Sequence, residues 1–348
     1  MSESSNQNFN HLKIHSQYSI CEGAIKIDDL QDFSKSNKIR SLALCDTSNL
    51  CGALEFAEKI SKVGTQPIIG TQINFKYGDC IGLLPLFALN EEGYKRIIKL
   101  SSNSFLENDE LSDPHVDFND LLDDNTGVAI FSGTIFGLFG ELFNKGKFSE
   151  ISDLYKNLKL KFDDRFYIEI QRHNDLNELG FEKFNLTKSL ELEIPIIATN
   201  EVFYINKDMH EAHDALICIG NKTYVNEKSR IRLSNQHYYK SNSEMTELFA
   251  DLPEALENNY NFPLRCNFRP LFSNPILPNI SSEKGGNADD VLKKDSLHGL
   301  RIKFDKIFGI KANDLNNNKT YLDYKDRLEH ELSIIIEMKY SSYFLIVS

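Results

Sequence analysis

The segment His11-Leu-Lys-Ile-His15-Ser-Gln-Tyr-Ser19 has the pattern of a short strand that runs into a polar turn. Alternate side chains of a strand point to the same side, so Lys13 and His15 are predicted to share one face. The imidazole of His15 could bind a metal ion, whereas the ammonium group of Lys13 has no lone pair and would repel a cation. The segment therefore predicts a metal-binding position in which a positive charge has replaced one ligand.

Short apolar runs alternate with amphipathic segments of helical length downstream of this strand. The predicted strands are residues 12–15, 41–45, 67–75, 82–87, 128–132, 166–170 and 195–199. The predicted helices are residues 27–36, 50–63, 91–101, 136–160, 174–192 and 208–219. This alternation is typical of an α/β protein with a mainly parallel sheet.

Polar side chains stand near the carboxyl ends of four of these strands, namely His15, Asp46, Glu169 and Glu201. Barrels and open parallel sheets both place their active sites at such ends. A barrel is favoured over a dinucleotide-binding fold because no Gly-x-Gly-x-x-Gly follows the first strand.

The alternation of strand-like and helix-like segments ends after about residue 225. A helix is predicted over residues 248–260, an irregular proline-containing stretch over 263–278 and a polar linker over 281–286. Two amphipathic helices are predicted over 289–304 and 324–338. The final residues, 343–348, are apolar and are expected to form a buried strand or the beginning of a helix, so we expect the natural protein to continue beyond them.

Composition limits the classes of protein that fit. With 348 residues, 41% hydrophobic and 26% charged, the chain is long enough for one large domain and part of another. A net charge of -12 argues against a stand-alone nucleic-acid binder. Six cysteines without a Cys-x-x-Cys pair indicate a reducing cytoplasm, and the glycines and polar residues within 127–143 argue against a membrane span.

Several ordered motifs resemble those of one family. Residues 11–19 and the pair Glu22-Gly23 resemble HLHxHSxYSxxDG, the opening motif of the bacterial replicative DNA polymerase III alpha subunit. Residues 42–50 resemble its LAxTDHGNL segment, and residues 324–347 resemble its YxxRLxxELxxIxxMxFxxYFLIV segment. The resemblance spans nearly the whole chain. It implies an α/β fold with a polymerase-and-histidinol-phosphatase (PHP) domain, a distorted (β/α)7 barrel, over residues 1–275, followed by a linker and the helical start of a polymerase palm over residues 276–348.

The resemblance also implies that the metal site of this PHP domain is degenerate. Intact PHP sites hold a metal cluster that some members use for exonuclease or phosphoesterase chemistry. At positions where the family has ligands, this chain carries Lys13, Thr47, Gln72, Leu83, Thr134 and Phe203. The positions that retain ligand chemistry are His15, Glu22, Asp46 and Glu201. The degenerate pocket is thus predicted to comprise Lys13, His15, Glu22, Asp46, Gln72, His173 and Glu201, with no bound metal expected and only His15, Asp46 and Glu201 as weak residual candidates.

The polar residues of this pocket also have structural interpretations. Lys13 is expected to form an ion pair with Asp46, Glu22 or Glu201, or else to extend to solvent. His15 is expected to be a hydrogen-bonded core histidine, and His173 to cap or pair at the rim of the barrel.

Three functions are compatible with the sequence. The first is the N-terminal part of a DNA polymerase III alpha subunit, with the PHP barrel kept as a catalytically inactive scaffold that docks the proofreading 3′–5′ exonuclease subunit. The second is an active metal-dependent PHP phosphoesterase or exonuclease, and the third is a binding module without enzymatic context.

For the first of these functions, the resemblance implies template-directed DNA synthesis by the full-length protein. It implies Mg²⁺ held by palm carboxylates downstream of this chain, deoxynucleoside triphosphates, primed template DNA, a sliding clamp and a clamp loader. It implies a cytoplasmic protein with no membrane partner.

Overall fold

The computed structural model describes residues 8–108, 112–230, 232–273, 287–311 and 314–348. The chain divides into two compact units, residues 1–272 and 273–348.

The first unit is built around a mixed sheet. Its strands are β1 (Lys13–Ile14), β2 (Ser41–Thr47), β3 (Gln66–Tyr77), β4 (Cys80–Ala88), β5 (Val116–Asp117), β6 (Val128–Phe131), β7 (Phe166–Ile170), β8 (Ile196–Ala198) and β9 (Glu201–Val202). They are hydrogen-bonded in the order β8-β7-β6-β4-β3-β2-β1-β9, with β5 paired to β3. Among the described pairs, β4 runs antiparallel to β3 and β6 and the rest are parallel. The prediction of a mainly parallel sheet is confirmed.

The sheet curls until its two edges come together. Its edge strands, β8 and β9, are consecutive in the chain and are separated only by Thr199 and Asn200. The three residue steps from Ala198 to Glu201 span at most about 11 Å, so the two edges must lie close to each other. This curled sheet agrees with the PHP-type barrel expected from the sequence, and it brings the carboxyl ends of the parallel strands around one opening.

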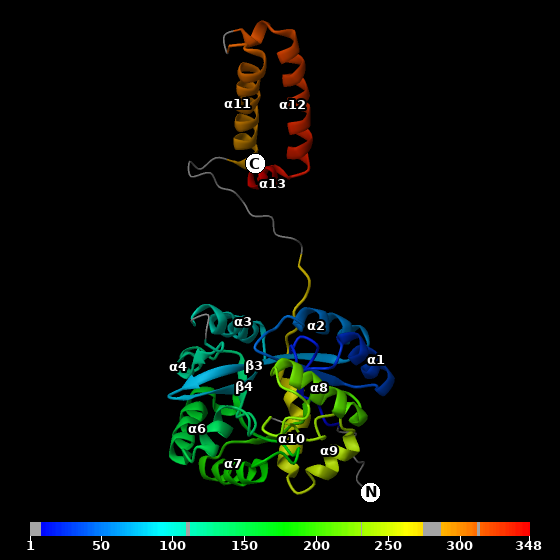
Figure 1. Ribbon diagram of the computed structural model, residues 1–348, viewed down its shortest axis with the longest axis vertical. Helices are drawn as coiled ribbons and strands as arrows, with labels where there is room; N and C mark the ends of the chain where they lie inside the picture. The colour runs from blue at the N-terminus through cyan, green and yellow to red at the C-terminus, as the bar shows by residue number, and fades with distance from the viewer. Residues whose placement is uncertain (1–7, 109–111, 231, 274–286, 312–313) are drawn as a thin grey trace. The chain divides into compact units, whose positions relative to one another are not determined.

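Helices cover the outside of the sheet (Figure 1). They are α1 (Ile27–Asn37), α2 (Ala53–Lys62), α3 (Glu91–Leu106), α4 (Phe118–Asp123), α5 (Leu138–Asn144), α6 (Phe148–Phe162), α7 (Glu178–Leu192), α8 (His210–Gly220), α9 (Asn242–Leu248) and α10 (Pro253–Asn261). Short 3-10 helices lie at Asp163–Arg165, Lys207–Met209 and Phe262–Arg265.

Strand β2 shows how the helices pack against the sheet. Leu42 and Leu44 join the apolar cluster under α1 and α2, whereas Ala43 and Cys45 join a separate cluster with Phe87 and Phe131.

Two helix predictions need correction. The single helix predicted over 136–160 is two helices, α5 and α6, because the chain turns at Gly146 with a φ of +73°, which glycine adopts without strain. The helix predicted over 248–260 is present only from Pro253, as α10, because Leu248 is the last residue of the separate helix α9. Helix α9 begins at Ser241 with a capping box that includes Glu244, and Pro253 occupies the first turn of α10.

The second unit is a small helical assembly. It contains α11 (Ala288–Phe308), a 3-10 turn at Leu315–Asn317, α12 (Lys319–Glu337) and α13 (Ser341–Val347), and α11 contacts both α12 and α13. Among the described residues, its buried apolar cluster consists of Phe304, Leu315 and Tyr321, with Leu300 and Ile310 packed against it. The two predicted amphipathic helices are present and longer than expected.

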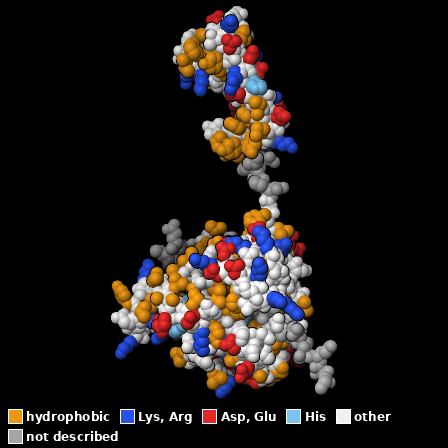
Figure 2. Space-filling model, turned by 90° about the vertical axis from the view of Figure 1, so that its right-hand side faces the viewer, with side chains coloured by type: hydrophobic (Ala, Val, Ile, Leu, Met, Phe, Trp, Pro, Cys, Tyr) orange, Lys and Arg blue, Asp and Glu red, His pale blue; other side chains and the backbone are white. Residues whose placement is uncertain are grey.

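The predicted helix start at the end of the chain is present as α13, but the expectation that it is buried is wrong. Tyr343, Phe344, Ile346 and Val347 are exposed because, within the described residues, α13 packs mainly through its contact with α11. Hydrophobic side chains accordingly gather on the surface of this unit in Figure 2.

All six cysteines lie within the described residues and have free thiols, as expected. None of the described helices combines the length and the apolar composition needed to cross a bilayer.

Candidate functional site

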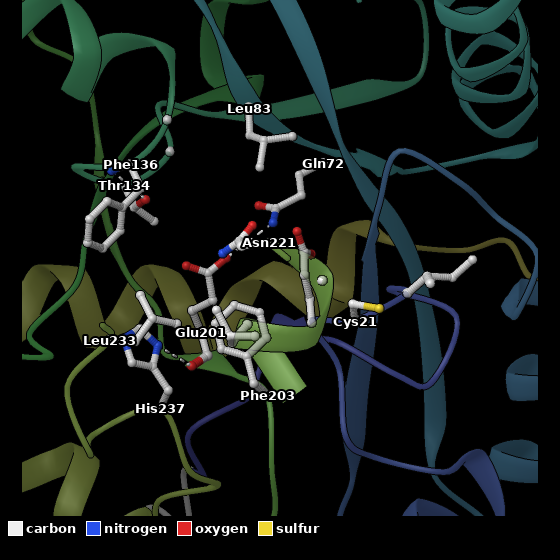
Figure 3. A pocket seen from close by; sticks show the side chains of 16 residues that line it. Cys21, Gln72, Leu83, Thr134, Phe136, Glu201, Phe203, Asn221, Leu233 and His237 are labelled. Carbon is white, nitrogen blue, oxygen red and sulfur yellow. Dashed lines mark hydrogen bonds between the residues drawn. The ribbon is translucent and has the colours of Figure 1, made fainter. Parts of the chain in front are cut away.

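A cavity of about 570 Å³ opens where the carboxyl ends of the strands meet (Figure 3). Six of the positions identified from the sequence line it, although they are far apart in the chain: Glu22, Gln72, Leu83, Thr134, Glu201 and Phe203. The register of the sheet explains this, because Thr47 is paired with Gln72 across β2 and β3, and Lys13 is paired with Glu201 across β1 and β9. The curled sheet therefore assembles the predicted pocket.

Lys13 is the charged group at the base of this site. Its side chain is fully buried, and its Nζ lies 3.1 Å from Oε1 of Glu201 and 3.7 Å from Oε1 of Glu169. The Nζ makes no hydrogen bond of good geometry among the described residues, so the attraction is chiefly coulombic. The predicted ion pair with Glu201 is confirmed, and the suggested partners Asp46 and Glu22 make other contacts. Glu169 is a second partner that the sequence reasoning did not assign to Lys13.

Burial and the charges of neighbouring side chains shift the pKa values of Lys13, Glu201 and Glu169 in opposite directions. Burial lowers the pKa of Lys13, but the attraction of Glu169 and Glu201 outweighs it, so the pKa is raised. Burial raises the pKa of Glu201, but Lys13 and a hydrogen bond from His15 lower it well below its usual range. For Glu169, burial prevails over Lys13 and raises the pKa. The base of the pocket is thus formed by a salt bridge in which Lys13 supplies the positive charge.

His15 is a buried, hydrogen-bonded histidine, as expected. Its Nε2 lies 3.1 Å from Oε1 of Glu201, its Nδ1 lies 3.3 Å from Oγ of Ser19, and its ring stacks on Phe203 at a centroid distance of 4.5 Å. Lys13 and His15 reach the same carboxylate oxygen, which confirms that they share a face.

Asp46 holds the turn after β1 in place. Its carboxylate accepts hydrogen bonds from the backbone N–H and the hydroxyl of Ser16, at 2.6 and 2.8 Å, and from the hydroxyl of Ser19 at 2.7 Å. In the same turn, a Cβ on Gly23 would lie 2.0 Å from the carbonyl oxygen of Ser16, so only glycine fits there. Both oxygens of Asp46 are therefore occupied by protein donors.

The other polar side chains of the pocket form hydrogen bonds with one another. Oγ1 of Thr47 donates to Glu22 at 2.6 Å, and the amide of Gln72 reaches Thr47 at 3.2 Å and Oε1 of Glu201 at 3.3 Å. A glutamate at position 72 would instead bring a second negative charge next to Glu201. The amide of Gln72 thus fits a pocket whose charge is already balanced by Lys13.

This donor set does not fit a metal cluster. The ammonium group of Lys13 lies where a cation would have to contact Glu201, and Leu83 and Phe203 present hydrocarbon to the cavity. The described residues that line the pocket therefore do not offer the converging set of ligands that a metal cluster requires.

Two family models match parts of the chain. A model described as "PHP domain" matches residues 11–173, and a model described as "Bacterial DNA polymerase III alpha NTPase domain" matches residues 292–348. The DNA polymerase III subunit alpha of Rickettsia conorii is 37% identical over 345 residues, which cover 98% of this chain and 29% of that protein. The corresponding subunit of Caulobacter vibrioides is 34% identical over 361 residues, which cover 100% of this chain and 30% of that protein.

The chain is homologous to bacterial DNA polymerase III alpha subunits. It spans less than a third of the length of these curated relatives.

His173, the last residue that the PHP model matches, lies outside the lining of the cavity but next to it. Its ring is parallel to that of His237 at a centroid distance of 4.1 Å, and His237 lines the cavity. Sequence reasoning placed His173 at the rim but missed His237, which comes from an irregular segment between α8 and α9. The signal that could have found His237 is the run of polar and aromatic residues from Gln236 to Lys240 that follows Leu233.

Proposed function

We propose that this chain is the N-terminal part of a bacterial replicative DNA polymerase III alpha subunit, and that its PHP domain is a catalytically inactive scaffold that docks the proofreading 3′–5′ exonuclease subunit. The observation that carries the proposal is the ion pair of Lys13 with Glu201, supported by Glu169. An internal ammonium group there replaces the charge that a metal cluster would supply, while the barrel around it is retained.

The rest of the proposal concerns the whole protein. Residues 1–275 are the PHP domain, and residues 276–348 are a linker and the helical start of the palm. The complete subunit performs template-directed DNA synthesis in the cytoplasm with Mg²⁺, deoxynucleoside triphosphates and primed template DNA. Its replisome partners are a sliding clamp and a clamp loader. The homology of the chain to alpha subunits supports these assignments. Reading the source gene beyond codon 348 tests them, and a palm with a closely spaced pair of aspartates is the expected continuation.

A hydrolysis assay tests the inactive scaffold. The purified 348-residue chain is incubated with single-stranded DNA or p-nitrophenyl phosphate in the presence of Mg²⁺, Mn²⁺ or Zn²⁺. We expect no hydrolysis above a protein-free control, and none from Lys13→His, because the other missing ligands are not restored. Metal-dependent hydrolysis that disappears in Glu201→Gln would overturn the scaffold and support an active PHP phosphoesterase.

A binding measurement tests the docking role separately. The exonuclease subunit of the source organism is titrated into the same chain and followed by calorimetry and co-elution. A saturable one-to-one complex is expected, whereas absence of binding would remove the docking role and leave the homology unaffected.

A further inference from the structure

The cavity at the carboxyl ends of the strands has a volume to which the proposed function gives no role. Its size, about 570 Å³, lies within the range of about 300–1,000 Å³ that is typical of small-ligand sites. Figure 3 shows Leu83, Phe136 and Phe203 around the polar side chains of Gln72 and Glu201. The apolar side chains that line the cavity are Ile20, Leu83, Phe136, Phe203, Ile217 and Leu233.

The lining of this cavity is also negatively charged. Glu22 and Glu201 both line it, and no lysine or arginine is among its described lining residues. The carboxylate of Glu22 accepts a hydrogen bond from Oγ1 of Thr47 at 2.6 Å and forms no ion pair with a described residue. The cavity therefore contains a carboxylate whose charge no neighbouring cation matches.

Gln72 turns a free acceptor toward the same space. The hydroxyl of Thr47 donates to Glu22, so it can only accept from the amide of Gln72, and Nε2 of that amide also contacts Oε1 of Glu201. These contacts fix the orientation of the amide. Gln72 is only 4% exposed, and its Oε1 accepts no hydrogen bond from a described residue.

Two carboxylate oxygens are free in the same way. Within the described part of the chain, Oε1 of Glu22 and Oε2 of Glu201 accept no hydrogen bond, because the contacts of these residues involve the other oxygen. The glutamine and the two glutamates thus offer three acceptors to one cavity. A neutral apolar ligand would cover these acceptors without replacing their hydrogen bonds to water, and an anion would be repelled by Glu22.

The other charged or titratable groups next to the cavity are matched within the protein. Lys13 is fully buried, and its charge faces Glu201 and Glu169. The two ring nitrogens of His237 contact the backbone carbonyl oxygen of Glu201 at 3.2 Å and Oδ2 of Asp175 at 2.9 Å. The charge that remains for a ligand to match is that of Glu22.

We propose that this cavity binds a free aliphatic amine, with the ammonium group of the ligand at Glu22 and Gln72. An ammonium group has three donors and no acceptor, and its hydrogen bonds to a carboxylate are strengthened by charge. The hydrocarbon chain of the amine lies against Leu83, Phe136 and Phe203. Leu83 and Phe203 occupy positions that the sequence comparison expected to carry metal ligands, and here they supply the apolar wall.

A binding titration with the full 348-residue chain tests the choice of ligand. Hexylamine and hexanoate, which have chains of the same length and opposite charges, are titrated at neutral pH and followed by saturation-transfer NMR. We expect hexylamine to bind with a dissociation constant of about 1 mM or lower, and hexanoate not to saturate. Absence of hexylamine binding, or equal binding of hexanoate, would overturn the proposal.

The length of the amine tests the apolar wall without any change to the protein. Butylamine lacks two of the methylene groups of hexylamine, and each methylene removed from water stabilises the complex. We expect butylamine to bind at least about fivefold more weakly than hexylamine. Equal affinities would show that the chain does not contact the wall, and would contradict the proposed mode of binding.

A charge variant locates the ammonium group. Glu22→Gln keeps an acceptor for Thr47 but removes the charge, so it is expected to weaken hexylamine binding at least about tenfold. The matched control is Glu55→Gln. Glu55 also accepts from a hydroxyl, that of Tyr18 at 2.7 Å, but does not line the cavity, so this variant should bind hexylamine like the wild type.

Equal effects of the two variants, or no effect of Glu22→Gln, would refute the position of the ammonium group. Circular dichroism shows whether each variant is folded. If Glu22→Gln does not fold, the comparisons of charge and chain length in the wild-type protein still decide whether an amine binds.

A lysine side chain of a partner protein has the same chemistry as a free amine. Nα-acetyl-lysine methylamide carries the four-carbon chain of butylamine on a peptide-like backbone, and we expect it to bind no more tightly than butylamine. Tighter binding would overturn the assignment to a free amine and indicate a lysine of a partner. Amine binding does not require the exonuclease subunit, so the outcome of the docking measurement leaves it unaffected.

Discussion

At the scale of the residue, Lys13 shows how a binding position can be closed by one side chain. A buried ion pair is a weak source of net stability, since desolvation of both charges offsets their attraction. Removal of one partner is different, because it leaves the other charge buried and uncompensated. In this pocket, Lys13 compensates for Glu201 and partly for Glu169.

Lys13→Met is therefore expected to destabilise the PHP domain by about 3–5 kcal/mol. Urea unfolding followed by circular dichroism measures the change, because the chain has no tryptophan to serve as a fluorescent probe. Lys59→Met is the matched control. Its partners are the exposed Asp28 and the partly exposed Glu55, so solvent screens these ion pairs and a much smaller loss of stability is expected.

A double variant separates charge from packing. Adding Glu201→Gln to Lys13→Met removes one uncompensated carboxylate and should restore part of the lost stability. If the two lysine variants were equally stable, or if the double variant were simply additive, Lys13 would not have this electrostatic role.

The site could be predicted from the sequence only in part. The motif around residues 11–19 predicted that Lys13 and His15 share a face, and it left Glu201, Asp46 and Glu22 open as partners of Lys13, of which Glu201 is confirmed. It could not choose Glu169 as the second partner, since that choice depends on the curl that brings β7 toward β1. The sequence suggested Asp46 as a possible metal ligand. Its carboxylate instead accepts three hydrogen bonds from the turn after β1, and residue spacing alone does not predict the geometry of that turn.

At the scale of the element, Asn259 of α10 links the segment that enters β1 to the end of β8. Its side chain accepts from the backbone N–H of Asn10 at 2.8 Å and donates to the carbonyl oxygens of Asn10 and Ala198, at 2.8 and 3.0 Å. All of these contacts are buried, so the backbone groups at the entrance to β1 and the end of β8 depend on one side chain.

Asn259→Ala is expected to cost at least about 3 kcal/mol, because each buried backbone group left without a partner costs about 1–3 kcal/mol. Thermal unfolding monitored at 222 nm would show a clearly lower melting temperature. The neighbouring variant Asn258→Ala removes one partly buried hydrogen bond to Ile196 and should have the smaller effect. The reverse order of the two variants would contradict this view of α10.

The periodicity of apolar residues predicted most of the helices and strands, but it did not predict where these helices and strands are interrupted. The helix predicted over 136–160 missed the turn at Gly146, and the predicted strand over 195–199 did not anticipate that pairing resumes at Glu201. Both features depend on how the segment packs against distant parts of the chain, which local apolar patterning does not record.

At the scale of the whole molecule, the two units differ greatly in the size of their cores. The first unit contains several extensive apolar clusters, whereas the cluster of the second centres on Phe304, Leu315 and Tyr321. A small unit buries a smaller fraction of its surface and is less stable on its own.

We therefore expect urea unfolding of the 348-residue chain to show two transitions, with the second unit unfolding at the lower denaturant concentration. A chain that ends at Phe272 should lose only the earlier transition. A single transition that shifts as a whole after this truncation would show that the two units unfold cooperatively.

The ion pair at the base of the pocket has a consequence for how the sequence can change over generations. Lys13→His returns a ligand type but leaves Glu201 and Glu169 buried without a lysine partner, and Gln72→Glu places another carboxylate beside Glu201. Each single step back toward metal chemistry thus passes through a less stable protein, and natural selection acts on one step at a time. Under the proposed scaffold function, the buried ammonium group of Lys13 thus makes the return of a metal site through single substitutions harder than further sequence change that keeps the barrel as a scaffold.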